Sequence, residues 1–296
     1  MSNTTDALPL AGKMALITGG SGGIGTACAR SFIEDGASVT LMGRGLESLI
    51  ATRRSLEPAL AEAATIELFA GDALDKADVV AAIDLAASIH GKLDICVPTV
   101  GGGSIRPLLM HNVESFQREL ELNIISAFLV VRYAVKPMLA AGGGSIVCIS
   151  SDAAKLVFPW LPAYSTAKSG LEGFVRAAAE ELSRFRIRVN AVRPGLTRTE
   201  ATASLFDDAA TYQAFAAEKP LGRLGEPEDI AAGVRYLAGP ESSWVTGQSF
   251  AIEGGNELRK APDMAAMVEQ IYGSEAYQAV LAGEAPFDVR DEDEWH

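Results

Sequence analysis

Seven short apolar segments recur along the first 255 residues of the chain. Segments such as 145–150 (SIVCIS) are apolar at nearly every position, which is typical of strands that are covered by helices on both faces. We expect strands at 14–18, 38–42, 65–70, 94–100, 145–150, 188–192 and 249–252. A sheet that is buried on both faces is built from parallel strands with helical crossovers.

Segments with helical spacing of apolar residues separate these strands. They predict helices at 23–35, 45–62, 75–90, 112–141, 163–185 and 226–238. The strict alternation of strand and helix predicts an α/β fold with a doubly wound parallel sheet of about seven strands. Because no Pro-, Gly- or Ser-rich linker and no internal repeat divides this part, residues 1–255 are expected to form one domain.

The residues after Gly255 follow a different pattern. A first helix is predicted to end at Gly273 and to carry on one face the apolar side chains of Met264, Met267, Val268 and Ile271. A second short helix is expected to be capped by Ser274 and to end at Gly283. The last nine residues, 288–296, contain five acids and are expected to be solvated. Residues 256–296 are therefore predicted to be a helical extension with an acidic tail, packed on the body or on a neighbouring subunit.

Composition and charge exclude some classes of function. With 48% apolar and 21% charged residues, the chain has ordinary globular composition. A net charge of −13 argues against a nucleic-acid partner, and no apolar run approaches the roughly 20 residues that span a membrane. The first residues lack the features of a secretory signal. Three isolated cysteines without metal-ligand spacing, Cys28, Cys96 and Cys148, indicate buried thiols in a reducing, cytoplasmic setting without a bound metal.

A glycine-rich loop follows the first strand and leads directly into a helix. Its sequence, TGGSGGIG, permits a tight turn and brings backbone N–H groups and a helix N-terminus to one place, which is typical of a pyrophosphate site. The alternative is a strand-to-helix turn without a ligand. The candidate cofactor-binding residues of this loop are Gly19, Ser21, Gly22, Gly23, Ile24 and Gly25.

The end of the second strand bears on the choice of cofactor. An acidic residue there would bind the ribose 2′-hydroxyl of NAD, but the chain has Gly43 followed by Arg44. The Arg44 guanidinium can bind a 2′-phosphate, so the sequence favours NADP(H) over NAD(H); the alternative is an ordinary solvated arginine. After the third strand, Asp72 and Ala73 are expected beside the adenine, although Asp72 could instead cap the following helix.

A tyrosine and a lysine four residues apart open the helix predicted at 163–185. Tyr164 and Lys168 lie on one helical face, where the ammonium is expected to favour the phenolate. Ser151 stands at the end of the fifth strand, where ligands bind in doubly wound sheets, and it can hydrogen-bond a substrate oxygen. Only one of Ser150 and Ser151 is expected to face the site. Asn123 lies in a predicted helix, either as a catalytic residue or as a buried, satisfied amide.

Together these motifs resemble the short-chain dehydrogenase/reductase family, of the single-domain ketoreductase type. The resemblance covers about residues 12–255 and rests on TGGSGGIG, LNIISAF, the ISS serine, YSTAK and NAVRPGLTRT, in family order. It implies a Rossmann fold and NAD(P)-dependent alcohol and ketone chemistry.

The resemblance also implies roles for single residues. Tyr164 is the implied acid/base, Ser151 polarises the substrate oxygen, Lys168 lowers the tyrosine pKa and holds the nicotinamide ribose, and Asn123 sustains a water-mediated proton path to Lys168. The nicotinamide is expected to lie against Pro194, Gly195, Leu196, Thr197 and Thr199. The resemblance further implies a lid at 199–219 and a homo-oligomer, a dimer or tetramer, that pairs the helices 112–141 and 163–185.

One segment departs from the family pattern. Where the family has Asn-Asn-Ala-Gly after the fourth strand, this chain has Pro98-Thr99-Val100-Gly101, followed by two more glycines. In the family the first Asn ties the central strands together, which Pro98 cannot do because it has no amide side chain and no N–H. Gly101 remains a candidate cofactor contact. We expect altered local geometry, and a loop of changed shape on the substrate side.

The loops after the fourth, fifth and sixth strands offer a mostly apolar wall for a small-molecule substrate. About half of the wall is expected to be local core or subunit contact; its members are Ile105, Leu108, Leu156, Val157, Phe158, Trp160, Leu161, Phe206, Tyr212 and Phe215. This wall favours a hydrophobic or cyclic ketone or alcohol.

Two alternative functions stay open. One is a reductase of 3-oxoacyl thioesters of a carrier protein or CoA, with docking arginines at Arg132, Arg176 or Arg184. The other is a non-catalytic NADP(H)-binding protein.

Overall fold

A seven-stranded parallel sheet forms the centre of the computed structural model, which describes residues 8–62, 64–260 and 262–285. The strand order is β3-β2-β1-β4-β5-β6-β7, so the order along the chain reverses between β1 and β4. The strands are β1 (Met14–Thr18), β2 (Ser38–Gly43), β3 (Ile66–Ala70), β4 (Ile95–Pro98), β5 (Gly144–Ile149), β6 (Ile187–Pro194) and β7 (Ser249–Ile252). The predicted seven-stranded Rossmann fold is therefore confirmed.

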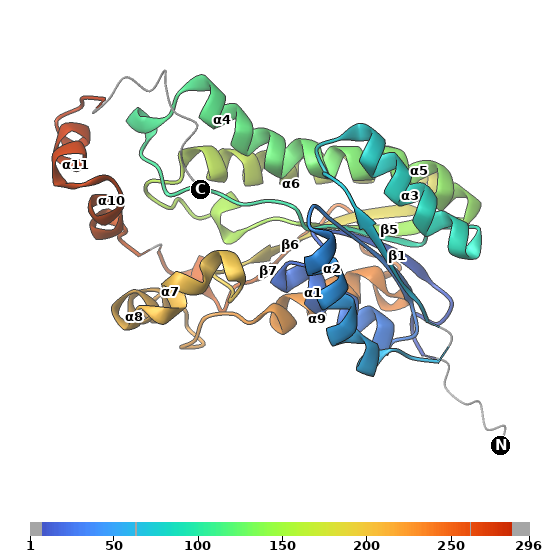
Figure 1. The fold of residues 1–296 in the computed structure, drawn as a ribbon. Coiled ribbons are helices and arrows are strands. Elements are labelled where there is room, and N and C mark those ends of the chain that lie inside the picture. Colours follow the sequence, from blue (N-terminus) through green and yellow to red (C-terminus); the bar gives the residue numbers. More distant parts are fainter. Residues whose placement is uncertain (1–7, 63, 261, 286–296) are drawn as a thin grey trace.

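Helices cover both faces of this sheet (Figure 1). One face carries α1 (Gly23–Glu34), α2 (Leu46–Leu56) and α9 (Pro227–Ala238), and the other carries α3 (Lys76–His90), α5 (Ser126–Ala140) and α6 (Pro162–Leu182). The side chains of β1 are all buried and alternate between the two faces of the sheet. An apolar core therefore lies on each face, between the sheet and the helices that cover it. The three cysteines are free and buried, and burial raises the pKa of each thiol, to about 12 for Cys28.

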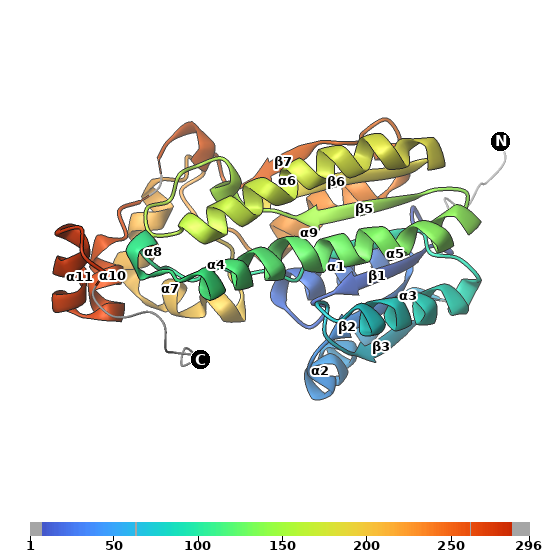
Figure 2. The same cartoon turned by 90° about the horizontal axis from the view of Figure 1, so that it is seen from above.

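The helix predicted at 112–141 is present but is not uniform. It consists of α4 (Val113–Leu120), a wider π-helical turn at Glu121–Ile125, and α5 (Figure 2). By length and composition the stretch Val113–Ala140 could cross a membrane. Its α5 part instead packs Val130, Ala134 and Met138 into the core below it, which explains the apolar composition.

The strand predicted at 94–100 ends earlier, at Pro98. Beyond Pro98 the chain runs through Thr99 and Val100 into the three glycines. The helix predicted at 45–62 also ends early, at Leu56, and a single 3₁₀ turn at Glu57–Ala59 follows, with Pro58 in it. Proline fits the first turn of a helix but not its interior, which accounts for the second break.

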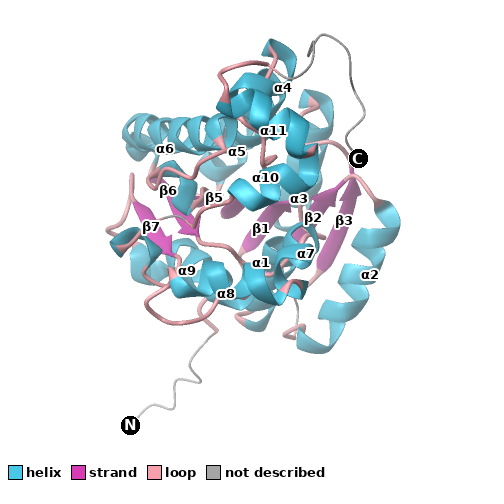
Figure 3. Cartoon of the chain, turned by 90° about the vertical axis from the view of Figure 1, so that its left-hand side faces the viewer, coloured by secondary structure: helices cyan, strands magenta, loops and turns pink. Residues whose placement is uncertain are grey.

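The helical extension lies at the carboxyl edge of the sheet, on the same chain. In Figure 3, α10 (Ala265–Tyr272) and α11 (Ser274–Leu281) stand in front of the strand ends, beside α7 (Ala203–Asp207) and α8 (Ala209–Ala217). Met264 and Val268 are buried as expected, but Ile271 is 46% exposed. Ser274 does not cap α11: it is the first helical residue, and its hydroxyl donates to Glu269. The predicted acidic tail, 288–296, lies outside the described residues.

Candidate active site

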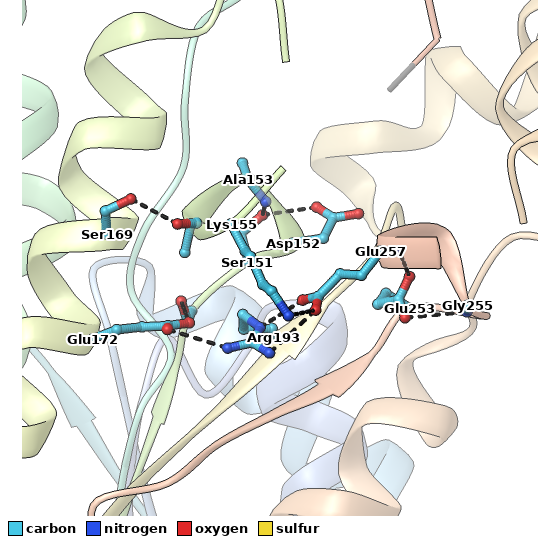
Figure 4. Close-up of polar contacts among 12 residues, drawn as sticks. Ser151, Asp152, Ala153, Lys155, Ser169, Glu172, Arg193, Glu253, Gly255 and Glu257 are labelled. Atoms are coloured by element: carbon cyan, nitrogen blue, oxygen red, sulfur yellow. Dashed lines mark hydrogen bonds and ion pairs between the residues drawn. The ribbon is translucent and has the colours of Figure 1, made fainter. Parts of the chain in front are cut away.

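Ser151 is held at the point where β5 ends. Its side-chain oxygen caps a 3₁₀ turn at Asp152–Ala154 by accepting the Ala153 N–H at 3.1 Å, and its hydroxyl lies 3.2 Å from the Asp152 carboxylate (Figure 4). Ser150 points the other way, because its hydroxyl donates to Glu172 on α6 at 2.8 Å. The two serines therefore point in different directions, as the alternation of side chains along a strand predicts.

Tyr164 lies in the first turn of α6, close to Ser151. A hydrogen bond with Ser151 lowers the tyrosine pKa, but burial, together with the charges of Asp152 and Glu119, raises this pKa to about 12. The Lys168 ammonium lies 5.6 Å from the centre of the tyrosine ring. A phenol with this pKa carries its proton at neutral pH, and Lys168 is not among the groups that shift the pKa, so the phenolate expected beside the lysine is not favoured by these groups.

Lys168 is buried one turn further along α6. Its ammonium donates to the Ile149 carbonyl at the end of β5 at 2.8 Å, which fixes the side chain under the tyrosine. Burial lowers the lysine pKa to about 8. Lys168 therefore loses its proton at a lower pH than an exposed lysine does.

Asn123 occupies the π-helical turn and is fully hydrogen-bonded. Its amide N–H₂ donates to the carbonyls of Glu119 and Gly102, both at 2.8 Å, and its oxygen accepts the Gly102 N–H at 3.0 Å. The satisfied-amide alternative therefore describes the observed contacts. The asparagine ties the loop after β4 to the helix, and π turns of this kind are frequent at functional sites.

The loop after β4 passes very close to these three side chains. A Cβ atom on Gly101 would lie 2.6 Å from the Asn123 oxygen and 2.9 Å from the Lys168 ammonium. A Cβ atom on Gly103 would lie 2.5 Å from the ring of Tyr164. Only glycine permits this approach. The triplet of glycines in the sequence predicted a loop of altered shape, but not its contact with Tyr164.

Thr99 makes the hydrogen bonds between neighbouring strands that Pro98 cannot make. Its hydroxyl donates to the Thr18 carbonyl at 2.6 Å, and its N–H donates to the same oxygen at 3.2 Å. These bonds join the ends of β1 and β4 at the place where the sheet order reverses. The departure from the family pattern therefore keeps the tie with a hydroxyl in place of an amide, which sequence reasoning missed.

The glycine loop fits a pyrophosphate. Gly19 has a φ of 68°, and a Cβ atom on Gly25 would overlap the Gly19 carbonyl. The N-terminus of α1 receives no side-chain cap from the described residues, so the N–H groups of its first turn, which includes Ile24, keep their hydrogen-bonding capacity. The cradle is thus shaped for backbone contact with a phosphate-bearing cofactor.

The candidate residues for the adenosine part line the next two strand ends. Arg44 follows β2, is exposed, and pairs with none of the described residues. The Ser21 hydroxyl lies 3.4 Å from the position of a Cβ on Gly43, so Ser21 and the end of β2 are neighbours. Asp72 precedes buried Ala73 and accepts the Leu74 N–H at 2.9 Å. Asp72 does not cap α3, since that cap is Asp75.

The segment after β6 closes the opposite side of the glycine loop. The Gly195 N–H, directly after Pro194, donates to Ile252 of β7 at 3.1 Å, and the Thr197 hydroxyl donates to the Gly195 carbonyl at 2.8 Å. A Cβ on Gly23 would lie 3.1 Å from the methyl group of Thr199. The two predicted cofactor segments therefore meet in space.

An apolar cluster, here called the outer cluster, lies next to Tyr164. Its buried members are Ala153, Phe158, Phe206, Phe215, Ala216, Leu224 and Met264. The residues packed against it are Ile105, Leu156, Trp160, Leu161, Tyr164, Leu196, Leu205, Tyr212 and Met267. Eight of the ten predicted wall residues belong to it. Leu108 and Val157 do not, since they are 64% and 85% exposed.

A network of ion pairs underlies the site. Arg193 of β6 contacts Glu172 of α6 at 3.2 Å and Glu257 at 2.8 Å, and Lys155 contacts Glu257 at 2.7 Å (Figure 4). The Lys219 ammonium lies 3.6 Å from the carboxylate of Asp152.

Within residues 8–62, 64–260 and 262–285, no group of three or more His, Cys, Asp or Glu side chains could hold a metal ion.

Comparison with known proteins finds clear similarities. A family model described as enoyl-(acyl carrier protein) reductase matches residues 19–257. The 3α-hydroxysteroid dehydrogenase of Mediterraneibacter gnavus is 35% identical over 245 residues, 83% of this chain and 97% of the relative. A short-chain type dehydrogenase/reductase structure from Mycobacterium ulcerans has a TM-score of 0.86 and 34% identity, covering 90% of this chain and 98% of that one. A 7α-hydroxysteroid dehydrogenase complexed with NADH and 7-oxo glycochenodeoxycholic acid has a TM-score of 0.79 and 32% identity, covering 86% and 98%.

Proposed function

This chain belongs to the short-chain dehydrogenase/reductase family, and we propose that it transfers a hydride between NADP(H) and an apolar or cyclic ketone or secondary alcohol. The observation that carries the proposal is the grouping of Ser151, Tyr164 and Lys168 at the carboxyl edge, beside a glycine loop shaped for a pyrophosphate. A binding protein without catalysis has no need for a half-buried phenol placed beside a serine.

The proposed mechanism uses the protonation states of the site. The bound nicotinamide supplies or accepts the hydride. In reduction Tyr164, with its raised pKa, donates its phenolic proton to the carbonyl oxygen that becomes the alcohol. Ser151 hydrogen-bonds the same oxygen as its negative charge develops. Lys168 holds the ribose hydroxyls, and in the oxidation direction its ammonium stabilises the phenolate.

Arg44 supports NADP(H) as the preferred cofactor. Its guanidinium is exposed at the end of β2, and the position where an acidic residue would bind the ribose of NAD is Gly43. The relative that was solved with NADH makes NAD(H) the alternative.

The outer cluster supports an apolar, cyclic substrate. It places aromatic and aliphatic side chains against Tyr164, which is suitable for a flat apolar ring. Two of the similar proteins are named for hydroxysteroids, which are secondary alcohols on fused rings.

Carrier-bound thioesters are the alternative substrate class. The description of the matched family model names an acyl carrier protein. However, Arg184 lies in the short turn that precedes β6, at the amino edge of the sheet, whereas Ser151 follows the carboxyl end of β5. Arg132 and Arg176 are exposed further along α5 and α6, beyond the first turns that carry the site. A docking patch at the mouth of the site is therefore not formed by these arginines.

We also propose a homo-oligomer, because two exposed surfaces are rich in large apolar side chains. Phe128 on α5 is 37% exposed and packs edge-on against Phe174 of α6. At the β7 edge, Trp244 is 99% exposed and Phe250 lies beside Tyr236. Sedimentation of the purified chain tests this: a single species of monomer mass overturns it.

The proposed reaction is tested by Tyr164→Phe. We expect this variant to bind NADPH as the wild type does, measured by nicotinamide fluorescence, and to lose at least a hundredfold in turnover of a cyclic ketone. Tyr236→Phe on α9 removes a hydroxyl far from the site and serves as the matched control. Near-normal turnover by Tyr164→Phe would refute the acid/base role, and a wild type that binds NADPH without reducing any ketone would favour a non-catalytic binding protein.

A further inference from the structure

The C-terminal helices contact the loops that surround the substrate side. The Tyr272 hydroxyl at the end of α10 donates to the Ile105 carbonyl at 2.8 Å. On α11, the ring of Tyr277 packs edge-on against Trp160, with 6.1 Å between ring centres. Met264 is a buried member of the outer cluster that contains Tyr164. These helices lie beyond residue 257, where the family match ends, so the contacts are an addition to the common fold.

Polar contacts also hold the first residues of the extension, Asn256 and Glu257. Glu257 is held by Arg193 and Lys155 (Figure 4). Asn256 is held by the Lys219 ammonium, which also faces Asp152 next to Ser151. Buried side chains that are tied at both ends do not move freely. The extension is therefore attached to the segments around the site both before its helices and within them.

Trp160 lies between this extension and the site in an unusual state. Its φ is +69°, a left-handed conformation that bulky residues rarely adopt, and its carbonyl accepts the Arg106 N–H at 2.7 Å. The indole N–H is buried and finds no hydrogen-bond partner among the described residues. Strain and an unpaired buried donor both oppose folding, and such features concentrate where a ligand supplies the missing partner.

We propose that the substrate site extends from Tyr164 to Trp160, and that α10 and α11 close its outer side. The Trp160 indole N–H then donates to a hydrogen-bond acceptor at the end of the substrate remote from the reacting carbon. The chain would thereby select apolar ring ketones and alcohols that carry a distal carbonyl, ester or carboxylate oxygen. This inference rests on the proposed function and adds to it a second point of recognition.

The test compares two cyclohexanones whose substituents at the 4-position are of similar length, methyl 4-oxocyclohexanecarboxylate and 4-propylcyclohexanone. Only the ester has an acceptor at the far end of the ring. We expect the wild type to prefer the ester in kcat/KM by about tenfold, a factor that corresponds to about 1.4 kcal/mol. In Trp160→Phe, which keeps a ring but loses the N–H, the ratio should fall to about one. Trp244→Phe removes an indole from the exposed β7 edge and should leave the ratio unchanged.

The outcomes separate this inference from the proposed function. Equal kcat/KM values for both ketones in an active wild type, or an unchanged preference in Trp160→Phe, overturn the role of Trp160 and leave the reaction intact. Failure of the wild type to reduce either ketone despite binding NADPH overturns both.

A binding measurement covers the case in which Trp160→Phe does not fold. In a Trp244→Phe/Trp295→Phe background, Trp160 is the remaining tryptophan of the chain. With NADP⁺ bound, the ester should shift the emission of Trp160 to longer wavelength more than 4-propylcyclohexanone does. Equal shifts with the two ketones contradict the hydrogen bond.

Discussion

The two halves of the site are built in different ways. On the proposed cofactor side, the candidate contacts come from short loops directly after β1, β2, β3 and β6, and glycines let the backbone itself form the surface. On the substrate side, segments as distant as Ile105, Trp160 and Tyr277 meet around Tyr164. Local spacing defines the first half and long-range packing the second. Substitution of single glycines should therefore impair the cofactor side, whereas the substrate side should be impaired by substitutions that break contacts between distant segments.

The largest expected effect comes from a substitution where the two halves meet. Gly103→Ala places a Cβ 2.5 Å from the Tyr164 ring and must displace either the ring or the loop. We expect a loss of a hundredfold or more in turnover, because a small misplacement of an acid/base is costly, with NADPH binding changed by less than threefold.

Its control lies one residue away. At Gly102 a Cβ would meet only Leu122, at 3.9 Å, so Gly102→Ala should keep most of the turnover. If both variants lose activity equally, the effect stems from general stiffening of the loop and the close packing on Tyr164 is not responsible.

The second prediction is that Arg44 affects the proposed cofactor side alone. If its guanidinium pairs with the 2′-phosphate, Arg44→Ala should weaken NADPH binding by about 10- to 100-fold, since a hydrogen bond to a charged group contributes about 1.5–3 kcal/mol. NADH binding should stay within twofold of the wild type. Arg54→Ala, an exposed arginine on α2, controls for the change in net charge. Equal losses for both cofactors would remove the basis for the NADP(H) preference.

A third prediction follows from the buried ammonium that both halves share. Burial lowers the pKa of Lys168 to about 8, so its charge is present below pH 8 and is lost as the pH rises further. NADPH affinity should therefore fall by up to about tenfold between pH 7 and pH 9. Lys168→Arg stays charged throughout this range, and its affinity profile should be flat. A sloping profile in that variant would place the titration on another group.

The same contrast explains what could be predicted from the sequence. The strands of the parallel sheet, the glycine loop and the positions of Ser151, Tyr164 and Lys168 follow from periodicity and spacing, because each depends on a few neighbouring residues. The raised pKa of Tyr164 did not follow, since it comes first from burial and then from the charges of Asp152 and Glu119, and the spacing of Tyr164 and Lys168 shows neither. Nor did the packing of the extension on its own site, because a helical pattern gives one apolar face and does not identify the surface that covers it.

Substitution of Thr99 gives the smallest expected effect. It tests whether the altered segment, Pro98 to Gly101, weakens the contact between the ends of β1 and β4. Thr99→Val keeps the shape but removes the hydroxyl that donates to Thr18, a bond worth about 1 kcal/mol. We expect the melting temperature to fall by about 2–4 °C, with NADPH binding and turnover nearly unchanged. Thr99→Ser retains the donor and should melt closer to the wild type. Because a neutral hydrogen bond to a backbone carbonyl suffices here, the sheet tolerates Pro98 at its centre. A Thr99→Val variant as stable as the wild type would mean that the pairing of β1 with β4 and the N–H of Thr99 join the strand ends without help from the hydroxyl.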